Sequence, residues 1–321
     1  MYSQTGGACR ASNYVSLLRK ALEKAGYPYV PVIALSLSGI EHHPGLKLTV
    51  PLLHRAVYCF FYGDLLLTLV NQCKPYELQR GSAEALAGRF TRQLAESMEK
   101  DGVSFKKTKA KCAEMIRAFA ALPMDRSRDT VQVGVVGEIY VKYSPLGNNN
   151  LEQFLVDNGA EVTFPGLMGF ILYCVYNMSM DYRLYRRGRV MHYFADFAYR
   201  FITTKQEVIN DLIRKEGTFR PSEPFDRTIE LIQSYMGQGC KMGEGWLLPA
   251  EMLELADSGV KNIVCTQPFG CLPNHICGKG MMKPIKDRNP DVNIVAVDYD
   301  ASASHVNQEN RIKLMLANAR S

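Results

Sequence analysis

Apolar residues recur at three- and four-residue spacing through much of the first half of the chain, the spacing of amphipathic helices. We predict helices over residues 13–25, 52–72, 83–100 and 107–122 and a short apolar strand over residues 30–37. Gly26 follows the first helix as a plausible C-cap. The polar segment 125–129 is the clearest boundary, so residues 1–128 are predicted to form a mostly helical N-terminal half with one strand.

After this boundary, short apolar runs alternate with helical patterns. We predict strands over residues 131–141, 161–164, 261–264 and 292–297. The helices expected between and after them cover residues 151–158, 167–216, 224–236, 247–257 and 306–319. Strands that alternate with helices favour a parallel sheet with right-handed crossovers. The expected fold class is therefore α/β, with Rossmann-like parallel sheet units and helical insertions, and residues 129–321 form the Rossmann-like domain.

Composition narrows the class of protein. The chain has 321 residues, 47% apolar and 22% charged, as in an ordinary globular protein, with a formal charge of +6. Arg183, Arg186, Arg187 and Arg189 fall in one helical stretch, which is either a solvated face or a surface for an anionic ligand or partner. Neither a basic stripe with interleaved aromatic residues nor a known nucleic-acid module is visible. We therefore predict no nucleic-acid partner.

Neither a leader peptide nor a membrane span is expected. The N-terminus is polar and rich in glycine, and the most apolar window, residues 50–70, is interrupted by His54, Arg55 and Asp64. A span needs ~20 residues with few or no charges, so a buried helix and no membrane partner are predicted. A cytoplasmic protein with nine cysteines holds them as free thiols or metal ligands rather than as a disulfide framework.

Residues 265–280 contain three of these cysteines, Cys265, Cys271 and Cys277, directly after a buried strand. In open α/β sheets, loops at the carboxyl ends of strands bind ligands. Cys271 precedes a proline suited to a first helical turn, and Cys9 lies just before the first predicted helix. The positive end of a helix dipole favours the thiolate, which is the form that ligates iron or zinc and the form that acts as a nucleophile.

The other thiols are interpreted by their setting. Free cysteine is often buried, so we expect the cysteines on apolar helices to be core residues. They are Cys59, Cys73, Cys112, Cys174 and Cys277, the last of which lies in the helix that follows Cys271. Cys265, at a strand end, is equally well a ligand or a core residue. Cys240 lies in a glycine-rich turn and is a further candidate ligand.

The six-residue steps between Cys265, Cys271 and Cys277 match neither ferredoxin nor zinc-finger spacing. A zinc site of Cys265, Cys271 and His275 is an alternative, although His275 fits better as a helix-start residue bonded to the backbone. Two acids follow strands: Glu138 can face a ligand, and Asp298 is expected either to hold a loop by accepting backbone N–H bonds or to touch substrate.

Four motifs together carry a family resemblance. They are Gly7-Ala-Cys9-Arg10-Ala-Ser-Asn13-Tyr14, Gly243-Glu244-Gly245-Trp246-Leu-Leu248, Gln267-Pro-Phe-Gly-Cys271-Leu-Pro-Asn-His275, and Asp298-Tyr-Asp300 with Asn307-Gln308 and Asn310-Arg311-Ile312-Lys313. The chain resembles the C-terminal module of the large acyl-CoA dehydratase activase-related proteins. More distantly it resembles the cluster-bearing subunits of 2-hydroxyacyl-CoA dehydratases, benzoyl-CoA reductases and double-cubane cluster proteins.

The resemblance implies an oxygen-sensitive iron–sulfur cluster on cysteines, of the 4Fe-4S or double-cubane type. It also implies a separate ATP-dependent activase that injects a low-potential electron, and radical chemistry on a CoA thioester. Cys271 and Cys9 match motif cysteines and become the predicted ligands, whereas Cys265 and Cys240 are candidates by proximity. Glu138, Glu244 and Asp298 would then surround the ligands or order their loops.

The chain also departs from the family pattern. It begins inside the pattern, without the strand expected before the Cys9 loop, without an upstream cysteine-bearing domain and without the ATP-binding module. The sequence therefore predicts either a fragment or a product of a split gene, with a partner chain that supplies the missing upstream half. A second copy of the chain is another candidate partner.

The predicted function is that of an iron–sulfur protein of the 2-hydroxyacyl-CoA dehydratase type. It would take part in ATP-driven low-potential electron transfer for the reduction or dehydration of CoA thioesters. The alternative is a non-catalytic electron-transfer or scaffold subunit that needs a partner chain. A third possibility is a structural remnant in which the cysteines are core residues and no metal binds.

Overall fold

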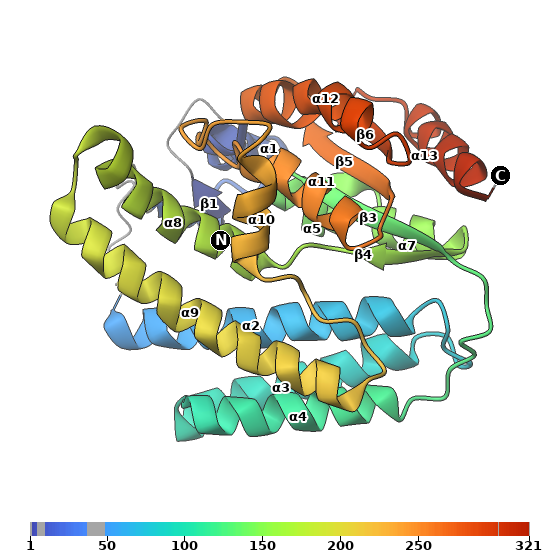
Figure 1. The fold of residues 1–321 in the computed structure, drawn as a ribbon, viewed down its shortest axis with the longest axis horizontal. Coiled ribbons are helices and arrows are strands. Elements are labelled where there is room, and N and C mark those ends of the chain that lie inside the picture. Colours follow the sequence, from blue (N-terminus) through green and yellow to red (C-terminus); the bar gives the residue numbers. More distant parts are fainter. Residues whose placement is uncertain (1, 5–9, 37–48, 301, 321) are drawn as a thin grey trace.

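The computed structural model describes residues 2–4, 10–36, 49–300 and 302–320. It confirms the α/β fold class (Figure 1). A four-stranded parallel sheet has the order β4-β3-β5-β6. Its strands are β3 (Val131–Gly137), β4 (Ala160–Thr163), β5 (Asn262–Pro268) and β6 (Asn293–Tyr299).

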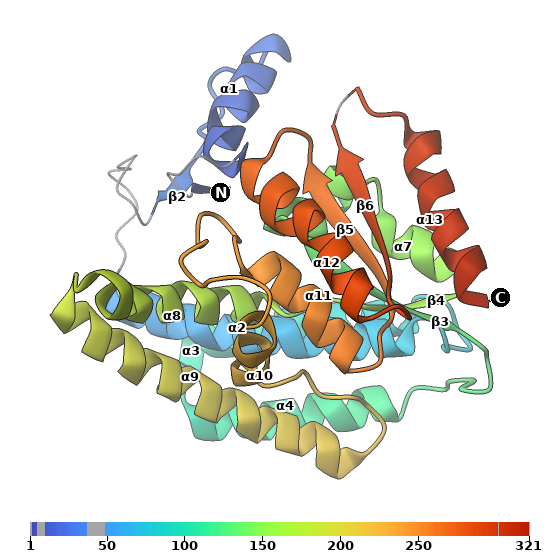
Figure 2. The same ribbon diagram turned by 45° about the horizontal axis from the view of Figure 1, so that its top comes forward.

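Helices cover both faces of this sheet (Figure 2). On one face, Val133, Val264 and Val297 contact residues of α7 (Leu151–Asp157) and α13 (His305–Arg320). The alternate strand residues point to the opposite face, toward α11 (Leu247–Asp257) and α12 (Gly280–Arg288). Burial of both faces explains why the middle of β5 and of β6 is a run of consecutive apolar residues, such as Ile263, Val264 and Cys265, instead of an alternation with polar residues.

A layer of helices lies on the α11 side of the sheet. It consists of α2 (Val50–Cys73), α3 (Ser82–Asp101), α4 (Phe105–Ala120), α8 (Leu167–Tyr185), α9 (Arg189–Glu216) and α10 (Phe225–Ile232). Its members α2, α3, α4 and α9 are below the sheet in Figure 1. The helices α8, α9 and α10 are the predicted helical insertion, because the chain forms them between β4 and β5. One cluster of buried side chains joins this layer to the α11 face of the sheet.

The helix α2 is the predicted buried helix of the 50–70 window. Among the described residues, it alone is long and apolar enough to cross a membrane by length and composition. Its inner face belongs to the main core, where Phe61, Leu65 and Leu69 are each at most 4% exposed. A core helix passes the same test of length and composition.

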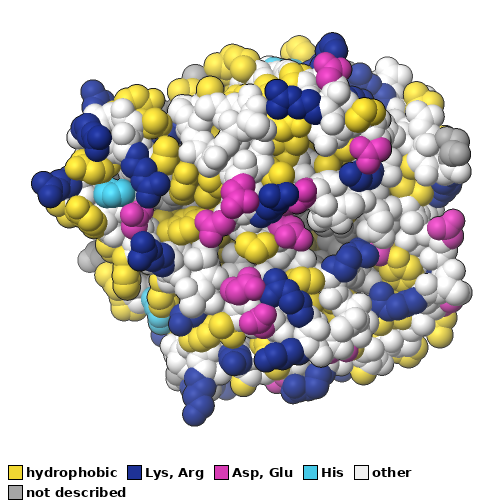
Figure 3. Space-filling model, in the orientation of Figure 1, with side chains coloured by type: hydrophobic (Ala, Val, Ile, Leu, Met, Phe, Trp, Pro, Cys, Tyr) yellow, Lys and Arg dark blue, Asp and Glu magenta, His cyan; other side chains and the backbone are white. Residues whose placement is uncertain are grey.

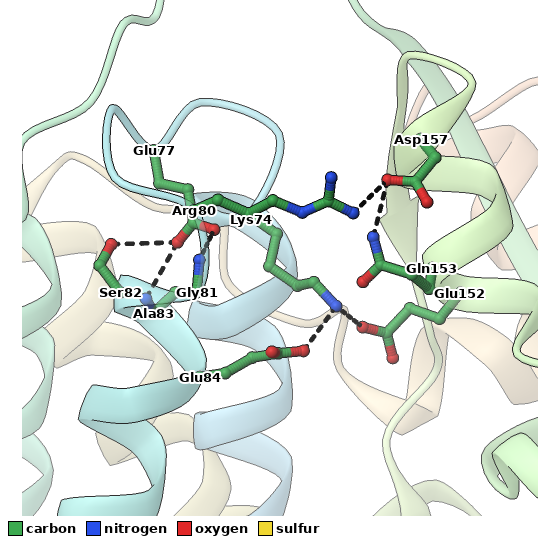
Figure 4. A network of polar contacts seen from close by, with 10 residues as sticks. All are labelled: Lys74, Glu77, Arg80, Gly81, Ser82, Ala83, Glu84, Glu152, Gln153 and Asp157. Atoms are coloured by element: carbon green, nitrogen blue, oxygen red, sulfur yellow. Dashed lines mark hydrogen bonds and ion pairs between the residues drawn. The ribbon is translucent and has the colours of Figure 1, made fainter.

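Polar contacts attach the helical layer to α7 (Figure 4). Lys74, at the end of α2, donates to Glu84 of α3 and to Glu152 of α7, at 2.8 Å in both cases. Arg80 donates to Asp157 of α7 at 2.7 Å. The Lys74 side chain is only 7% exposed, so these are the less screened contacts of the network.

The N-terminal residues form a separate small unit, which stands beyond the main sheet in Figure 2. In this unit two short strands pair in parallel, β1 (Tyr2–Gln4) and β2 (Ala34–Ser36). Between them in the sequence come a 3-10 helix (Arg10–Asn13) and α1 (Tyr14–Lys24). The expectation that no strand precedes the Cys9 loop is therefore wrong. The strand predicted over residues 30–37 is shorter than expected, and residue 37 lies outside the described residues.

The strand predicted over residues 131–141 is also too long. It ends at Gly137, whose φ of 137° turns the chain, and α5 (Ile139–Tyr143) and α6 (Pro145–Asn148) follow. A Cβ on Gly137 would lie 1.9 Å from the Thr266 carbonyl oxygen, so only glycine fits this turn. The apolar run in α5 imitates a strand because it is buried on one side of a single helical turn.

Candidate functional site

Two of the residues singled out in the sequence, Cys271 and Glu138, lie where the strand order reverses. From β3 the chain proceeds outward to β4, and β5 then returns to pair with the other side of β3. Such a switch point at the carboxyl ends of strands is the usual ligand position in an open α/β sheet. Glu138 follows β3 directly, and Cys271 follows β5 by three residues.

Cys271 is fully buried in the turn that leads from β5 into a π-helix (Asn274–Lys279). Its N–H donates to the Pro268 carbonyl at 3.1 Å. The Asn274 side-chain amide donates to the Cys271 sulfur at 3.3 Å. Ala11 and Tyr14 pack against Cys271, so the first helical segment of the N-terminal unit closes the site. Asn274 lies within the Cys271 motif, but its contact with the sulfur carries no signal in the sequence.

Glu138 is the N-cap of α5 and is 2% exposed. Its Oε2 accepts from the Val141 N–H at 2.9 Å and from the Tyr14 hydroxyl at 3.3 Å. The Tyr14 and Tyr140 rings also contact each other, with centroids 5.5 Å apart. The contact with Tyr14 was missed, because residues 124 positions apart carry no local signal of proximity; the only hint was that Tyr14 shares a motif with Cys9.

Glu244 enters the same site from the turn before α11 and is 4% exposed. Gly245 gives this turn its shape, because its φ is 39° and a Cβ there would lie 2.1 Å from the Cys240 carbonyl oxygen. The Trp246 N–H also donates to that carbonyl, at 2.8 Å. The turn therefore fixes the direction of Glu244.

We call Cys271, Glu138, Glu244, Tyr14 and Asn274 the Cys271 site. Burial raises the pKa of Glu138, and the nearby Cys271 raises it further, against backbone N–H bonds that lower it. Burial likewise raises the pKa of Glu244, and the charge of Glu138 adds to this effect. Two carboxyl groups that share a buried site do not both ionise readily. The pair therefore favours a state with at most one negative charge.

Several buried acceptor oxygens near the end of β5 and in the Cys271 site have no hydrogen-bond partner among the described residues. They are Glu244 Oε2, Asn274 Oδ1 and Gln267 Oε1. Buried polar atoms are normally paired, so such a group of exceptions is typical of a place for water, an ion or a ligand. The sequence alone does not reveal this feature, because it depends on where each side chain points.

Cys265 lies in a different environment from Cys271. Its side chain belongs to the main core on the α11 face, where a Cβ on Gly278 would be 3.5 Å from the sulfur and 3.7 Å from Leu248. Burial raises the pKa of the Cys265 thiol to about 12. Its described contacts therefore correspond to the core interpretation, and a role as a ligand stays a prediction.

The remaining cysteines differ in burial. Cys9 lies outside the described residues. Cys73 and Cys112 are fully buried, as predicted, and Cys277 is 8% exposed. Cys59 was expected in the core but is exposed, because it lies on the outer side of α2. Cys240 is exposed in its turn, so it is accessible to a partner.

His275 and Asp298 lie beside the site. His275 Nε2 accepts from the Gly270 N–H at 3.1 Å, which confirms the expected bond to the backbone. The Asp298 carboxylate accepts from the Gln267 side-chain amide at 2.7 Å rather than from the loop N–H groups we expected. Asp298 therefore joins β6 to β5 through a side chain.

The chemistry of the Cys271 site fits an iron–sulfur cluster in part. An amide donor to the cysteine sulfur and deep burial are features that tune such clusters. Within the described part of the chain, however, no group of three His, Cys, Asp or Glu residues is arranged to hold a metal ion. The alternative of a zinc site at Cys265, Cys271 and His275 therefore has no support from the described residues. Further ligands would have to come from Cys9 or from a partner chain.

No protein-family model matches the chain, and no curated protein or solved structure in the comparisons matches it either. These comparisons therefore provide no evidence about the function of the chain. What remains are the motifs, the fold and the chemistry of the Cys271 site.

Proposed function

We propose that the chain is a cytoplasmic iron–sulfur protein of the 2-hydroxyacyl-CoA dehydratase type. It takes part in ATP-driven, low-potential electron transfer for the reduction or dehydration of CoA thioesters. An ATP-dependent activase is its electron donor in this proposal, and a partner chain supplies further cluster ligands.

One observation carries the proposal. Cys271 is buried at the carboxyl end of β5 and packs against Ala11, and Ala11 follows Cys9 by only two residues. Consecutive Cα atoms are 3.8 Å apart, so two residues span less than about 8 Å. Joint coordination of one inorganic centre by Cys271 and Cys9 is therefore part of the proposal, supported by the contact between Cys271 and Ala11.

In this proposal Cys271 and Cys9 hold the cluster, and Cys265 is a further candidate. The cluster, when bound, would supply the low-potential electron. The Asn274 amide donates to the Cys271 sulfur and so removes some of its negative charge. The Tyr14 hydroxyl donates to Glu138, and the raised pKa values of Glu138 and Glu244 favour their neutral forms, which lowers the negative charge of the site. Net charge and hydrogen bonds to sulfur are the terms that set the potential of such a cluster.

Anaerobic purification with iron and sulfide analysis tests the proposal. We expect a brown protein with charge-transfer absorption and, after reduction, an electron paramagnetic resonance signal. The Cys271→Ala and Cys9→Ala variants should each lose iron. The matched control is Cys112→Ala, because Cys112 is equally buried but lies in α4 among helical core residues.

The control separates loss of a ligand from loss of packing. A C112A protein that keeps its iron while C271A loses it supports the proposal. A colourless protein that contains no iron, prepared together with its partner chain, would reject it. Equal loss of iron in C271A and C112A would also count against ligation by Cys271.

One observation favours the alternative of an electron-transfer or scaffold subunit without a substrate of its own. A cavity of about 290 Å³ lies between the helical layer and the sheet, lined by residues such as Thr68, Leu172 and Glu254. None of its lining residues belongs to the Cys271 site. The alternative predicts a cluster-bearing protein that turns over no CoA thioester when the activase and ATP are present, and turnover would refute it.

A further inference from the structure

The α8–α9 hairpin exposes a group of large apolar side chains. On α9, Val190 is 84% exposed, Phe197 70%, Phe194 65%, Tyr193 61% and Met191 48%. We call these five residues the outer α9 face. In Figure 3 the corresponding end of the molecule, at the left, shows hydrophobic side chains beside several Lys and Arg side chains. Contiguous exposed apolar patches on proteins usually mark a binding surface.

These residues form one stripe along the helix. Val190, Tyr193, Phe194 and Phe197 have the spacing i, i+3, i+4 and i+7, so they lie on one side of α9. Ala195 and Ile202, on the other side, are 1% and 4% exposed. The first turns of α9 are therefore apolar on two sides, although only the inner side is covered by the described residues. The same spacing is the recognition pattern of helices that bind through an apolar face.

The hairpin holds this face in a fixed position. The Ser179 hydroxyl of α8 donates to Asp196 of α9 at 2.6 Å and lies 2.7 Å from His192 Nδ1. Arg183, also on α8, lies 3.8 Å from Asp196. Contacts across the two helices make the stripe rigid before any partner arrives, which lowers the entropy cost of binding.

We propose that the outer α9 face binds the same face of a second copy of the chain, so that the two hairpins pack against each other in an isologous dimer. A twofold interface needs a surface that is complementary to itself, and an apolar helical stripe meets this condition. The proposal is independent of the iron–sulfur function.

The exposed area is close to what a stable dimer needs. Aromatic side chains bury 150–250 Å² each, so the exposed fractions of Tyr193, Phe194 and Phe197 leave roughly 400 Å² to cover. Val190 and Met191 bring the outer α9 face to roughly 600 Å² per copy, and specific interfaces bury about 600–1,000 Å² per partner.

The arginines select the orientation of the two copies. Arg186, Arg187 and Arg189 are exposed at the hairpin turn, at one end of the stripe. In a parallel arrangement the two sets would meet. In an antiparallel arrangement centred on Phe194 each set faces only the single exposed Arg200 of the partner, and the two sets lie at opposite ends, separated by roughly 20 Å along the helices at 1.5 Å per residue. This exceeds the Debye length of about 8 Å, so their repulsion is screened.

The same position of the arginines argues against a lipid surface. A helix that lies in a membrane interface has basic residues along its polar flank, level with its apolar stripe. Here the exposed arginines of α9 lie at the two ends of the stripe, Arg189 at one end and Arg200 at the other. On the flank, Arg183 of α8 lies 3.8 Å from Asp196, which offsets its charge.

Analytical ultracentrifugation of the full chain in reducing buffer tests the proposal. We expect a monomer–dimer equilibrium for the native sequence. The double variant Phe194→Ser/Phe197→Ser should weaken the dimer by at least about a hundredfold, because aromatic residues at the centre of an interface are the usual hot spots. The matched control is Leu146→Ser/Leu314→Ser, which removes two leucines exposed by 84% and 64% on other elements.

A photo-crosslinking side chain at position 197 tests the orientation. In the antiparallel dimer it should link to partner residues near positions 187–194, as mapped by mass spectrometry. A native chain that stays monomeric at all concentrations overturns the proposal, as does a dimer that the double variant leaves intact. Binding of the monomer to phosphatidylserine vesicles that the double variant abolishes would overturn it in favour of a lipid surface.

Discussion

A buried ion pair between α5 and α11 makes a sharp test of the energetics of this fold. Lys142 Nζ lies 3.0 and 3.1 Å from the two carboxylate oxygens of Glu251, and the side chains are 3% and 4% exposed. Burial by itself lowers the pKa of Lys142, but Glu251 outweighs it and the pKa is raised. Burial raises the pKa of Glu251, and Lys142 opposes this effect. The two charges are therefore tolerated only as a pair.

The substitution Lys142→Met leaves Glu251 buried without its cation. Removal of one partner of a buried pair costs about 3–5 kcal/mol if the other stays charged. Glu251 can instead bind a proton. From an ordinary pKa of 4.5, this costs about 3.4 kcal/mol at pH 7 and about 0.7 kcal/mol at pH 5, at 1.36 kcal/mol per unit. We therefore expect K142M to lose about 3 kcal/mol at pH 7 and about 1 kcal/mol at pH 5.

The sign follows from linkage. In the variant, the folded-state pKa of Glu251 lies above its unfolded value. The contribution of Glu251 to the stability of the folded variant is therefore fully present below pH 4.5 and is lost as the pH rises. The double variant K142M/E251L removes both charges of this pair. Its free energy of unfolding should stay within about 1 kcal/mol of the native value at both pH values.

Urea unfolding provides the assay. The single tryptophan, Trp246, is fully buried, so its fluorescence reports loss of the core around α11. Unfolding at pH 5 and pH 7, followed by fluorescence and by circular dichroism, gives the free energy of unfolding of the native protein and of both variants at each pH. An equal loss for K142M at both pH values, or a double variant as unstable as K142M, would refute the reasoning.

Three further predictions concern stability. Burial raises the pKa of Glu254 to about 8, so its contribution to folding stability is full below pH 4.5 and is lost as the pH rises through 8. The Glu254→Gln variant can still accept the hydrogen bond from Thr228, so its urea midpoint should match that of the native protein at pH 5 and exceed it at pH 9. Gly137→Ala should lower the free energy of unfolding by about 2 kcal/mol or more, because the added Cβ meets the Thr266 carbonyl. Gly88→Ala, in an open part of α3, should raise it by about 0.5–1 kcal/mol, and similar urea midpoints for the two variants would contradict the strain argument. Lys74→Met should cost about 1–3 kcal/mol in urea, because it removes two charge-assisted bonds, and an unchanged midpoint would mean that the α7 attachment contributes nothing.

The periodicity of the sequence determined most helices. The predicted ranges 52–72 and 247–257 correspond to α2 (Val50–Cys73) and α11 (Leu247–Asp257), because each has an apolar set at helical spacing and a clear boundary. The run after Gly137 was misjudged as strand, since a short apolar run looks the same in a buried strand and in one turn of a buried helix.

The candidate site was only half predictable. Local motifs pointed to Cys271 and Glu244, and the end of a strand pointed to Glu138. Their meeting with Tyr14 depended on the order β4-β3-β5-β6, which brings four distant segments to one edge of the sheet. Strand order follows from pairing between residues more than a hundred positions apart, such as Val136 and Cys265, and no local pattern encodes it.

The apolar stripe of α9 shows the same division. The sequence by itself determined that residues 190–197 form a helix with apolar positions at three- and four-residue spacing, because side-chain periodicity is a local property. Only the tertiary structure decided that this stripe faces outward while Ala195 and Ile202 face α8 and the core. Burial depends on what the rest of the chain places against a helix, and that is set by the packing of the whole molecule.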